Sequence, residues 1–224
     1  FGGGLWVDYD NDGYLDFITY SVPCRLWRNP DGSNAFALVQ QVPVPMAITV
    51  GASAADFNGD GYVDVYQGGF EVEGVSYEPD TIVFNQQGMF FTNLWQEPPP
   101  LKHARGITSC DFDEDGYMDV YVSNYRLEAN DLWRNDGGTF TNIATDYGVA
   151  GDYNGYSWSY GHTIGSAWGD LDNDGHIDLF VGNFSHPDAD QDRPKFYRNL
   201  GSAGGWHFED KSGTAGLAWQ ESYA

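Results

Sequence analysis

The chain has 224 residues, of which 41% are hydrophobic and 17% aromatic, so it can bury a core and a disordered chain is excluded. A formal net charge of −23 with only ten Lys and Arg residues excludes nucleic acid and anionic membrane surfaces as partners, because phosphate binding needs clustered cations. No apolar run approaches the roughly 18 residues of a membrane span, and no signal peptide precedes the first motif, which predicts a mature or trimmed piece.

A nine-residue acidic motif, Asp-x-Asp/Asn-x-Asp-Gly-x-x-Asp, occurs four times along the chain. Its copies begin at Asp8, Asp56, Asp111 and Asp170. The intervals of 48, 55 and 59 residues are too irregular for a solenoid, but they are typical of propeller blades with variable outer loops.

The same order of strands surrounds each copy of the motif. A short apolar stretch precedes it, and an apolar strand follows it at 14–20, 62–68, 117–123 and 176–182. A third strand ends in Asn, at 25–29, 81–85, 131–135 and 195–199, and a fourth lies within 35–41, 89–95, 139–145 and 206–212. Four strands per unit is the strand count of a β-propeller blade, with units of roughly 1–48, 49–103, 104–162 and 163–224.

Three segments interrupt this regularity. The stretch 146–162 is rich in Gly and Tyr and is predicted to be an extended surface loop, while 70–80 and 185–194 are predicted to be outer-edge loops. Trp6, Trp27, Trp133 and Trp168 stand at strand or repeat-equivalent positions and are expected in the core. Trp95, Trp158, Trp206 and Trp219 are freer, so a stacking role for them stays open.

The acidic motif has the composition of a calcium loop. Ca²⁺ takes six to eight oxygen ligands in flexible geometry, and a glycine at position 6 permits the sharp turn around the ion. Positions 1, 3, 5 and 9 supply side-chain oxygens and position 7 a backbone carbonyl. The predicted ligands are Asp8, Asp10, Asp12, Tyr14 and Asp16; Asp56, Asn58, Asp60, Tyr62 and Asp64; Asp111, Asp113, Asp115, Tyr117 and Asp119; and Asp170, Asp172, Asp174, His176 and Asp178. Up to four structural Ca²⁺ ions are therefore expected, and Mg²⁺ suits such loops less because it prefers a strict octahedron.

An EF-hand or dockerin-type loop has the same first nine positions, but it carries a bidentate Glu at position 12 and flanking helices. Here position 12 is Thr19, Gln67, Val122 or Val181, and the flanks have the Val, Ile, Phe and Tyr content of strands. The EF-hand interpretation is rejected.

The repeated loops, the Leu-Trp-Arg-Asn and Phe-Tyr-Arg-Asn segments and the Gly-x-Phe turns resemble FG-GAP/VCBS repeats, the calcium-loop blades of integrin α-like propellers. Segments 105–124 and 165–183 are similar to secreted propellers of the ASPIC/UnbV and cartilage acidic protein type. This resemblance implies an all-β propeller, commonly of seven blades, in a secreted or cell-surface protein used for adhesion. Four units are too few for seven blades, which favours a segment of a larger propeller over a closed four-bladed ring.

Several functions are compatible with the sequence. The first is a non-catalytic, calcium-stabilised adhesion or recognition module outside the cell or in the periplasm, where calcium is abundant, with a protein or glycan ligand at the cell surface or matrix. A calcium-dependent carbohydrate-binding propeller and a self-assembling protomer of an extracellular filament are the alternatives. An enzyme is disfavoured, because the five His residues lack metal-ligand spacing and no nucleophile elbow, P-loop or dinucleotide motif occurs. A bridge between Cys24 and Cys110 and a glycan on Asn183 both stay open.

Overall fold

The structure is a computed structural model with two compact units, Phe1–Ala104 and Arg105–Ala224. It describes residues 3–20, 23–33, 35–42, 44, 48–72, 76–153, 155, 159–184 and 192–216. Across these ranges, no helix has both the length and the apolar character needed to cross a bilayer.

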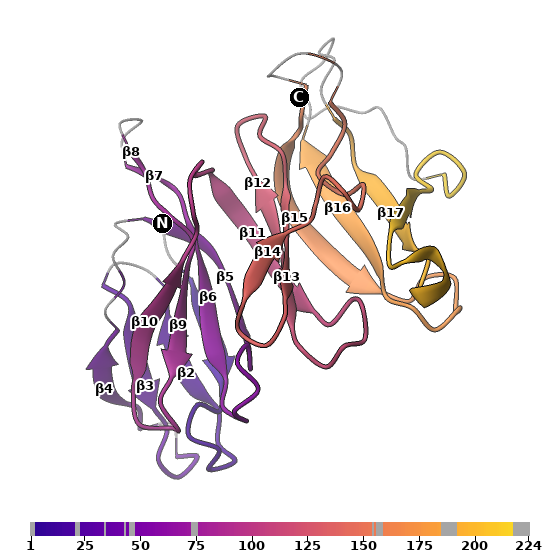
Figure 1. Cartoon of the computed structure of the whole chain (residues 1–224). Coiled ribbons are helices and arrows are strands. Elements are labelled where there is room, and N and C mark those ends of the chain that lie inside the picture. The colour runs from indigo at the N-terminus through magenta and orange to yellow at the C-terminus, as the bar shows by residue number, and fades with distance from the viewer. Residues whose placement is uncertain are drawn as a thin grey trace. The chain divides into compact units, whose positions relative to one another are not determined.

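The first unit consists of two four-stranded sheets (Figure 1). One sheet has the order β1-β2-β3-β4, with β1 (Gly4–Val7), β2 (Asp16–Thr19), β3 (Arg25–Arg28) and β4 (Ala37–Gln41). The other has the order β10-β9-β6-β5, with β5 (Thr49–Ala55), β6 (Asp64–Gly69), β9 (Thr81–Asn85) and β10 (Phe91–Gln96). A two-stranded ribbon, β7 (Glu71–Val72) with β8 (Ser76–Tyr77), extends from the connection between β6 and β9.

The second unit repeats this plan. One sheet contains β11 (Ala104–Cys110), β12 (Asp119–Asn124), β13 (Asp131–Asn135) and β14 (Phe140–Asn142) in sequence order. The other contains β15 (His162–Gly169), β16 (Asp178–Phe184), β17 (Lys195–Asn199) and β18 (Phe208–Asp210), with a short 3-10 helix η1 (Ser202–Gly204) before the last strand.

The four sheets confirm the predicted fold class. Each is an antiparallel sheet of four strands that follow one another, which is the construction of a propeller blade. In every sheet the acidic motif forms the turn between the first and the second strand, as in the turn from Val7 to Asp16, which are paired across β1 and β2. The total blade number of about seven remains a prediction.

In each unit, an apolar core cluster is shared by the two sheets. In the first unit, Ile18 and Leu26 of one sheet and Val65 and Val83 of the other belong to a single buried cluster. In the second unit, the corresponding cluster spans both sheets from Tyr121 to Leu179 and Tyr197. Because a sheet is apolar on the face it buries, the two blades of a unit stabilise each other by covering that face.

Three expectations about local structure are wrong. Segment 70–80 contains the β7–β8 ribbon and is more than a loop. Trp6, expected in the core, is 59% exposed and lies against Phe17, whereas Trp133 is buried as expected. The predicted surface loop 146–162 begins inside the core, because Val149 is buried and its carbonyl accepts a hydrogen bond of 2.8 Å from the Tyr121 hydroxyl. Trp158, Trp219 and residues 185–191 lie outside the described residues.

Both cysteines are free thiols, which answers the question left open by the sequence. Cys24 is buried in the core of the first unit, and burial raises the pKa of its thiol to about 12. Asn183 of the sequon uses its side-chain amide inside the fold: Nδ2 donates to the Arg193 carbonyl at 2.8 Å, and Oδ1 accepts from the Thr163 hydroxyl at 2.7 Å.

Candidate metal-binding loops

The last aspartate of each acidic loop is a buried anchor. In the third loop, Asp119 is fully buried and its carboxylate accepts two backbone hydrogen bonds, from Phe112 at 3.1 Å and from Asn135 at 2.8 Å. These bonds join the start of the loop to the end of the third strand. The other three loops have the same arrangement, with Asp16, Asp64 and Asp178 as the anchors.

The first aspartate closes the turn of each loop. Asp111 accepts hydrogen bonds from the backbone N–H groups of Asp115 at 3.1 Å and Gly116 at 3.0 Å, and the same pair of bonds recurs at Asp8, Asp56 and Asp170. Gly116 at position 6 has φ 93°, and nothing lies within 4 Å of the place where a Cβ would be. The glycine is therefore required by its left-handed backbone and not by lack of space.

The residue at position 7 is held by the carboxylate at position 5. In each loop its backbone N–H donates to that carboxylate over 2.9–3.0 Å, which orients the peptide that follows the glycine. The residues concerned are Tyr14, Tyr62, Tyr117 and His176. Their carbonyl oxygens as metal ligands remain a prediction.

An arginine from the third strand binds the aspartates at positions 3 and 5 in three of the four loops. Arg28 Nε lies 2.6 Å from Asp10 and its Nη2 2.9 Å from Asp12. Arg134 pairs in the same way with Asp113 and Asp115, and Arg198 with Asp172 and Asp174. In the second loop the equivalent residue is Phe84, and position 3 is Asn58 in place of Asp.

Three of the loops bring three carboxylates together, with one oxygen of each within 4.8 Å of the others. The groups are Asp8, Asp10 and Asp16; Asp111, Asp113 and Asp115; and Asp170, Asp172 and Asp178. The predicted ligands Asp12, Asp119 and Asp174 stand in these loops but outside the groups of three. Among the described residues, no such group forms from Asp56, Asp60 and Asp64 of the second loop, where an amide occupies position 3.

The donor set fits a hard cation. All side-chain donors at these positions are carboxylate or amide oxygens, which are the ligands that Ca²⁺ accepts. Asp10 Oδ1 and Asp113 Oδ1 are buried without a hydrogen-bond partner, although the other oxygen of each carboxylate faces an arginine. The Asp113 side chain is only 3% exposed. A buried oxygen of this kind costs free energy unless it has a partner, and a cation held by the loop would supply one.

Burial disturbs the titration of the anchors. Desolvation raises the pKa of Asp64 to about 7 and that of Asp119 to about 8, despite the backbone hydrogen bonds that favour the ionised form. The pKa values of Asp16 and Asp178 are raised for the same reason. A divalent cation beside these carboxylates would favour the ionised form and reverse the shift.

The asparagine that ends the third strand links neighbouring loops. Asn85 Nδ2 donates to the Val63 carbonyl of its own loop at 3.1 Å and to the Tyr9 carbonyl of the preceding loop at 2.8 Å. Asn199 does the same in the second unit, at 3.1 Å to Ile177 and 2.9 Å to Phe112. Each of these asparagines thus ties the loop of one blade to the loop of the next.

These arginines and asparagines were missed as functional positions by the sequence reasoning. The sequence does contain a signal for them, because the dipeptide Arg-Asn ends three of the four third strands. The exception is Phe84-Asn85 in the second unit, which is also the unit with Asn58 in place of Asp at position 3 of its loop. The paired departure indicates that the two positions act together.

Four-stranded blades with an acidic loop between the first two strands, in which carboxylates gather as they could around a metal ion, define a class of propeller repeats. The model of the FG-GAP-like repeat matches residues 8–66 and 111–181, which is more than half of the chain. The chain therefore belongs to the FG-GAP-like repeat family.

Among solved structures, the fold is similar to that of a lectin from Agrocybe aegerita whose structure is described as the basis of its specific recognition of non-reducing terminal N-acetylglucosamine. The two chains are 18% identical with a TM-score of 0.53, and the match covers 98% of this chain. It covers 55% of the lectin, so this chain spans just over half the length of that relative. A comparison with curated protein sequences found no match.

Proposed function

We propose that this chain is a non-catalytic recognition module in which each acidic loop holds one structural Ca²⁺ ion, up to four in all. The observation that carries the proposal is the buried, partnerless Oδ1 of Asp113, which lies in a loop whose other donors are also oxygens. The repetition of this loop at the same place in four blades supports a common structural role for the ion. It gives no support to a single reactive centre.

The residues of the chain prepare the loop for the ion. The first aspartate fixes the turn and the last fixes the loop to the third strand. The arginine pairs with one oxygen of the carboxylate at position 3 and leaves Oδ1 of Asp10 and of Asp113 available. Bound Ca²⁺ would supply the positive charge that the gathered carboxylates need. Because the ligands come together only in the folded chain, the binding free energy adds to the stability of the fold.

Removal of calcium tests this proposal. A site whose Kd is 100-fold below the free calcium concentration adds about 2.7 kcal/mol to the free energy of unfolding. With two such sites in each unit, excess EDTA should lower the melting temperature by roughly 10 °C or more, and added CaCl₂ should restore it. Magnesium at the same concentration serves as the control for ionic strength. An unchanged melting curve in EDTA would rule out structural calcium.

The location follows from the affinity expected of such sites. Extracellular calcium modules bind with a Kd of about 10⁻⁴–10⁻³ M, a range that the calcium level of the cytosol does not reach. We therefore place the protein outside the cell, at its surface or in the periplasm, as part of this proposal. Calcium titration by isothermal calorimetry measures the Kd, and a submicromolar value for all loops would contradict the placement.

A glycan is the ligand class that we favour over a protein ligand. The support is the lectin among the similar structures, together with a group of neutral polar side chains that line a hollow beside the second loop. A glycan array probed with the chain in CaCl₂ and again in EDTA tests this part. Binding of defined glycans that disappears in EDTA supports it, and an array without signal contradicts it while leaving the role of calcium to the melting experiment.

A further inference from the structure

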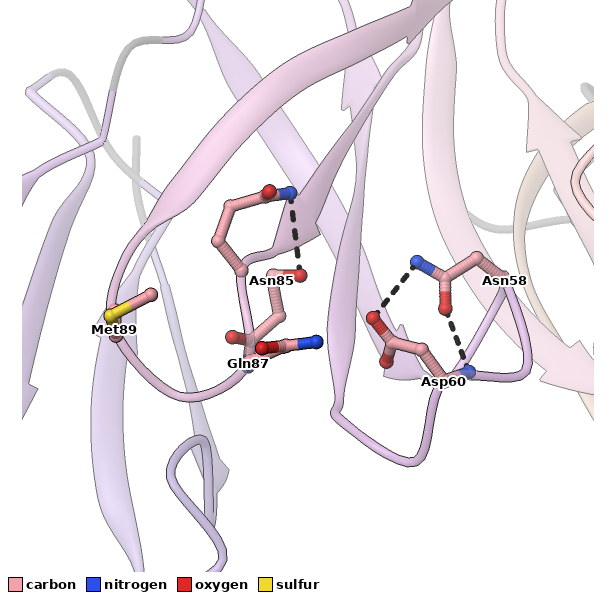
Figure 2. A pocket seen from close by; sticks show the side chains of 6 residues that line it. Asn58, Asp60, Asn85, Gln87 and Met89 are labelled. Carbon is pink, nitrogen blue, oxygen red and sulfur yellow. Dashed lines mark hydrogen bonds between the residues drawn. The ribbon is translucent and has the colours of Figure 1, made fainter.

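The surface beside the second acidic loop is hollowed. The hollow has a volume of about 260 Å³ and lies between that loop and the turn that joins β9 to β10 (Figure 2). In Figure 2, Asn58 and Asp60 stand on one side and Asn85 and Gln87 on the other. The complete lining is Asn58, Asp60, Asn85, Gln86, Gln87 and Met89. It consists of four amides, one carboxylate and one thioether.

The hollow coincides with the missing arginine. In the other three loops, the outer oxygens of positions 3 and 5 are covered by a guanidinium group, for example by Arg28 over Asp10 and Asp12. In the second loop, Phe84 stands at the arginine position and is buried, with only 7% of its surface exposed. In place of a guanidinium, Asn58 Nδ2 donates a hydrogen bond of 3.3 Å to Asp60 Oδ2, and both side chains line the open hollow.

The turn that forms the far wall is also different from its counterpart. Asn85 pairs with Phe91, whereas the equivalent Asn135 pairs with Phe140, so the turn of the second blade is one residue longer. Gln87 in this turn has a left-handed backbone with φ 53°, at the position where the third blade has Gly137 with φ 66°. A side chain is disfavoured in this conformation. Its presence there places an amide on the wall of the hollow.

The turn has a rigid support. A Cβ on Gly88 would lie 2.9 Å from the Cα of Asp10, so the turn packs directly against the backbone of the first acidic loop. The Gly88 N–H also donates to Asn85 Oδ1 at 2.8 Å, and Asn85 is the residue that links the two loops. The wall is therefore fixed by both loops of the first unit.

The lining chemistry suits hydroxyl groups. Amides offer both donors and acceptors without charge, which is what a ligand with several hydroxyls requires. Asp60 adds one acceptor, and Met89, 61% exposed, adds an apolar edge. An anionic ligand would meet the Asp60 carboxylate and the acidic loop behind it. The volume lies just below the roughly 300–1,000 Å³ of pockets for drug-sized ligands, which fits a single sugar ring.

We propose that this hollow is a subsite for one neutral saccharide unit, held by the exposed amides of Asn58 and Gln87 with its apolar face toward Met89. The inference rests on the proposed glycan-binding function and assigns it a place. Asn58 and Asp60 are also predicted calcium ligands of the second loop, so an ion bound there would fix the positions of these two side chains. Saccharide binding is therefore expected to require calcium. The first, third and fourth loops do not bind in this way, since an arginine occupies the corresponding space.

Two variants of the full chain test the subsite in excess CaCl₂. Gln87→Gly introduces the residue that the third blade uses in this backbone conformation, so the melting temperature should stay equal or rise while saccharide affinity falls roughly tenfold. The double variant Phe84→Arg, Asn58→Asp copies the arrangement of the other loops and should abolish binding. Thr139→Ala, at an exposed position of the β13–β14 turn, is the matched control and should bind as the unchanged chain does.

The probes are N-acetylglucosamine, mannose and galactose as free sugars, an oligosaccharide that ends in whichever of them binds, and glucuronic acid, with affinities measured by ligand-observed NMR. Stronger binding of the oligosaccharide than of its free sugar indicates a glycan end as the ligand, and equal binding indicates the free sugar. If the unchanged chain binds a sugar and both variants bind it equally well, the assignment of the subsite to this hollow is rejected, and the sugar binds at another site of the chain. If the unchanged chain binds none, or prefers glucuronic acid, the neutral saccharide subsite is overturned, and structural calcium is still judged by the EDTA melting curve.

Discussion

The second and third acidic loops have the same backbone plan and different charge arrangements. Both run from a first strand to a second strand, and both end in a fully buried aspartate that accepts the same two backbone hydrogen bonds. The third loop has four carboxylates at the predicted ligand positions and Arg134 beside them, whereas the second has three such carboxylates and Phe84. Counted over the predicted ligand positions and the arginine position alone, both arrangements carry a formal charge of −3. The third loop also contains Glu114, whose carboxylate contacts His176 Nδ1 at 2.9 Å.

The predicted ligand positions and the arginine position together thus keep one formal charge in the two loops and reach it by different residues. A loop with four carboxylates and no counter-charge would repel itself strongly in the absence of metal. A loop with three carboxylates and an arginine would attract Ca²⁺ less. The second loop has Asn58 where the third has Asp113, and Phe84 where the third has Arg134. Because both positions differ together, the second loop has neither the strong repulsion nor the weakened attraction for Ca²⁺. This difference also exposes the outer side of the second loop, which is the hollow assigned to a saccharide.

The largest expected effect comes from the anchors that the two loops share. Asp64→Ala and Asp119→Ala should each lower the free energy of unfolding by about 2–4 kcal/mol in CaCl₂, since two buried N–H groups lose their acceptor and the ion loses a ligand. Urea unfolding followed by tryptophan fluorescence measures the loss. Asp136→Ala, which removes an exposed carboxylate beside Arg134, is the control and should change stability by less than about 0.5 kcal/mol. A much smaller loss for Asp64→Ala than for Asp119→Ala would show that the two loops are not equivalent.

A smaller effect is expected when the counter-charge of the third loop is removed. Arg134→Phe should lower stability by roughly 1 kcal/mol in EDTA, because the guanidinium is a third exposed and its ion pairs are partly screened. The double variant Arg134→Phe, Asp113→Asn gives the third loop the residue types that the second loop has at these two positions, Asn and Phe. It should recover part of the lost free energy of unfolding. Urea unfolding of both single variants and the double variant in EDTA gives their coupling energy. Additive losses would contradict charge compensation.

The smallest effect is expected from an extra carboxylate in the second loop. Asn58→Asp should raise the calcium affinity of that loop by up to about tenfold, because affinity follows the number of charged ligands. In EDTA the added carboxylate has no counter-charge, so the free energy of unfolding should fall by up to about 1 kcal/mol. Calcium titration by calorimetry measures the affinity. Gln96→Glu adds the same charge at an exposed position of β10 and should leave the affinity unchanged; an equal gain there would attribute the effect to overall charge.

Most of the fold could be predicted from the sequence because its signal is repeated. Four copies of one strand order each support the others, and the turn glycines and alternating apolar residues are local features. The failures concern features that occur once. Val149 is buried in a core cluster whose members are distant in the sequence, among them Tyr121, 28 residues before it, which donates to its carbonyl. The β7–β8 ribbon has two residues per strand, too few for a pattern. Trp6 stands in a first strand but faces outward against Phe17.

The candidate site was predicted in part for the same reason. The ligand positions are local, since nine consecutive residues contain them all. The residues that orient them are distant: Arg134 reaches Asp113 from another strand, and Asn199 reaches Phe112 from another blade. The hollow beside Asn58 arises from the shape of a turn and from an absent arginine, neither of which has a motif of its own.

The asparagine links have a consequence for the order in which the chain takes shape on the ribosome. The carbonyl of Tyr9 receives its hydrogen bond from Asn85, which is made 76 residues later, and Phe112 waits 87 residues for Asn199. At about 5–20 residues per second, the first loop of each pair is exposed for roughly 4–17 s before its partner emerges. These two loops are therefore completed only after the following blade has been synthesised, and a chain cut before that point leaves the ribosome with a loop that is never completed.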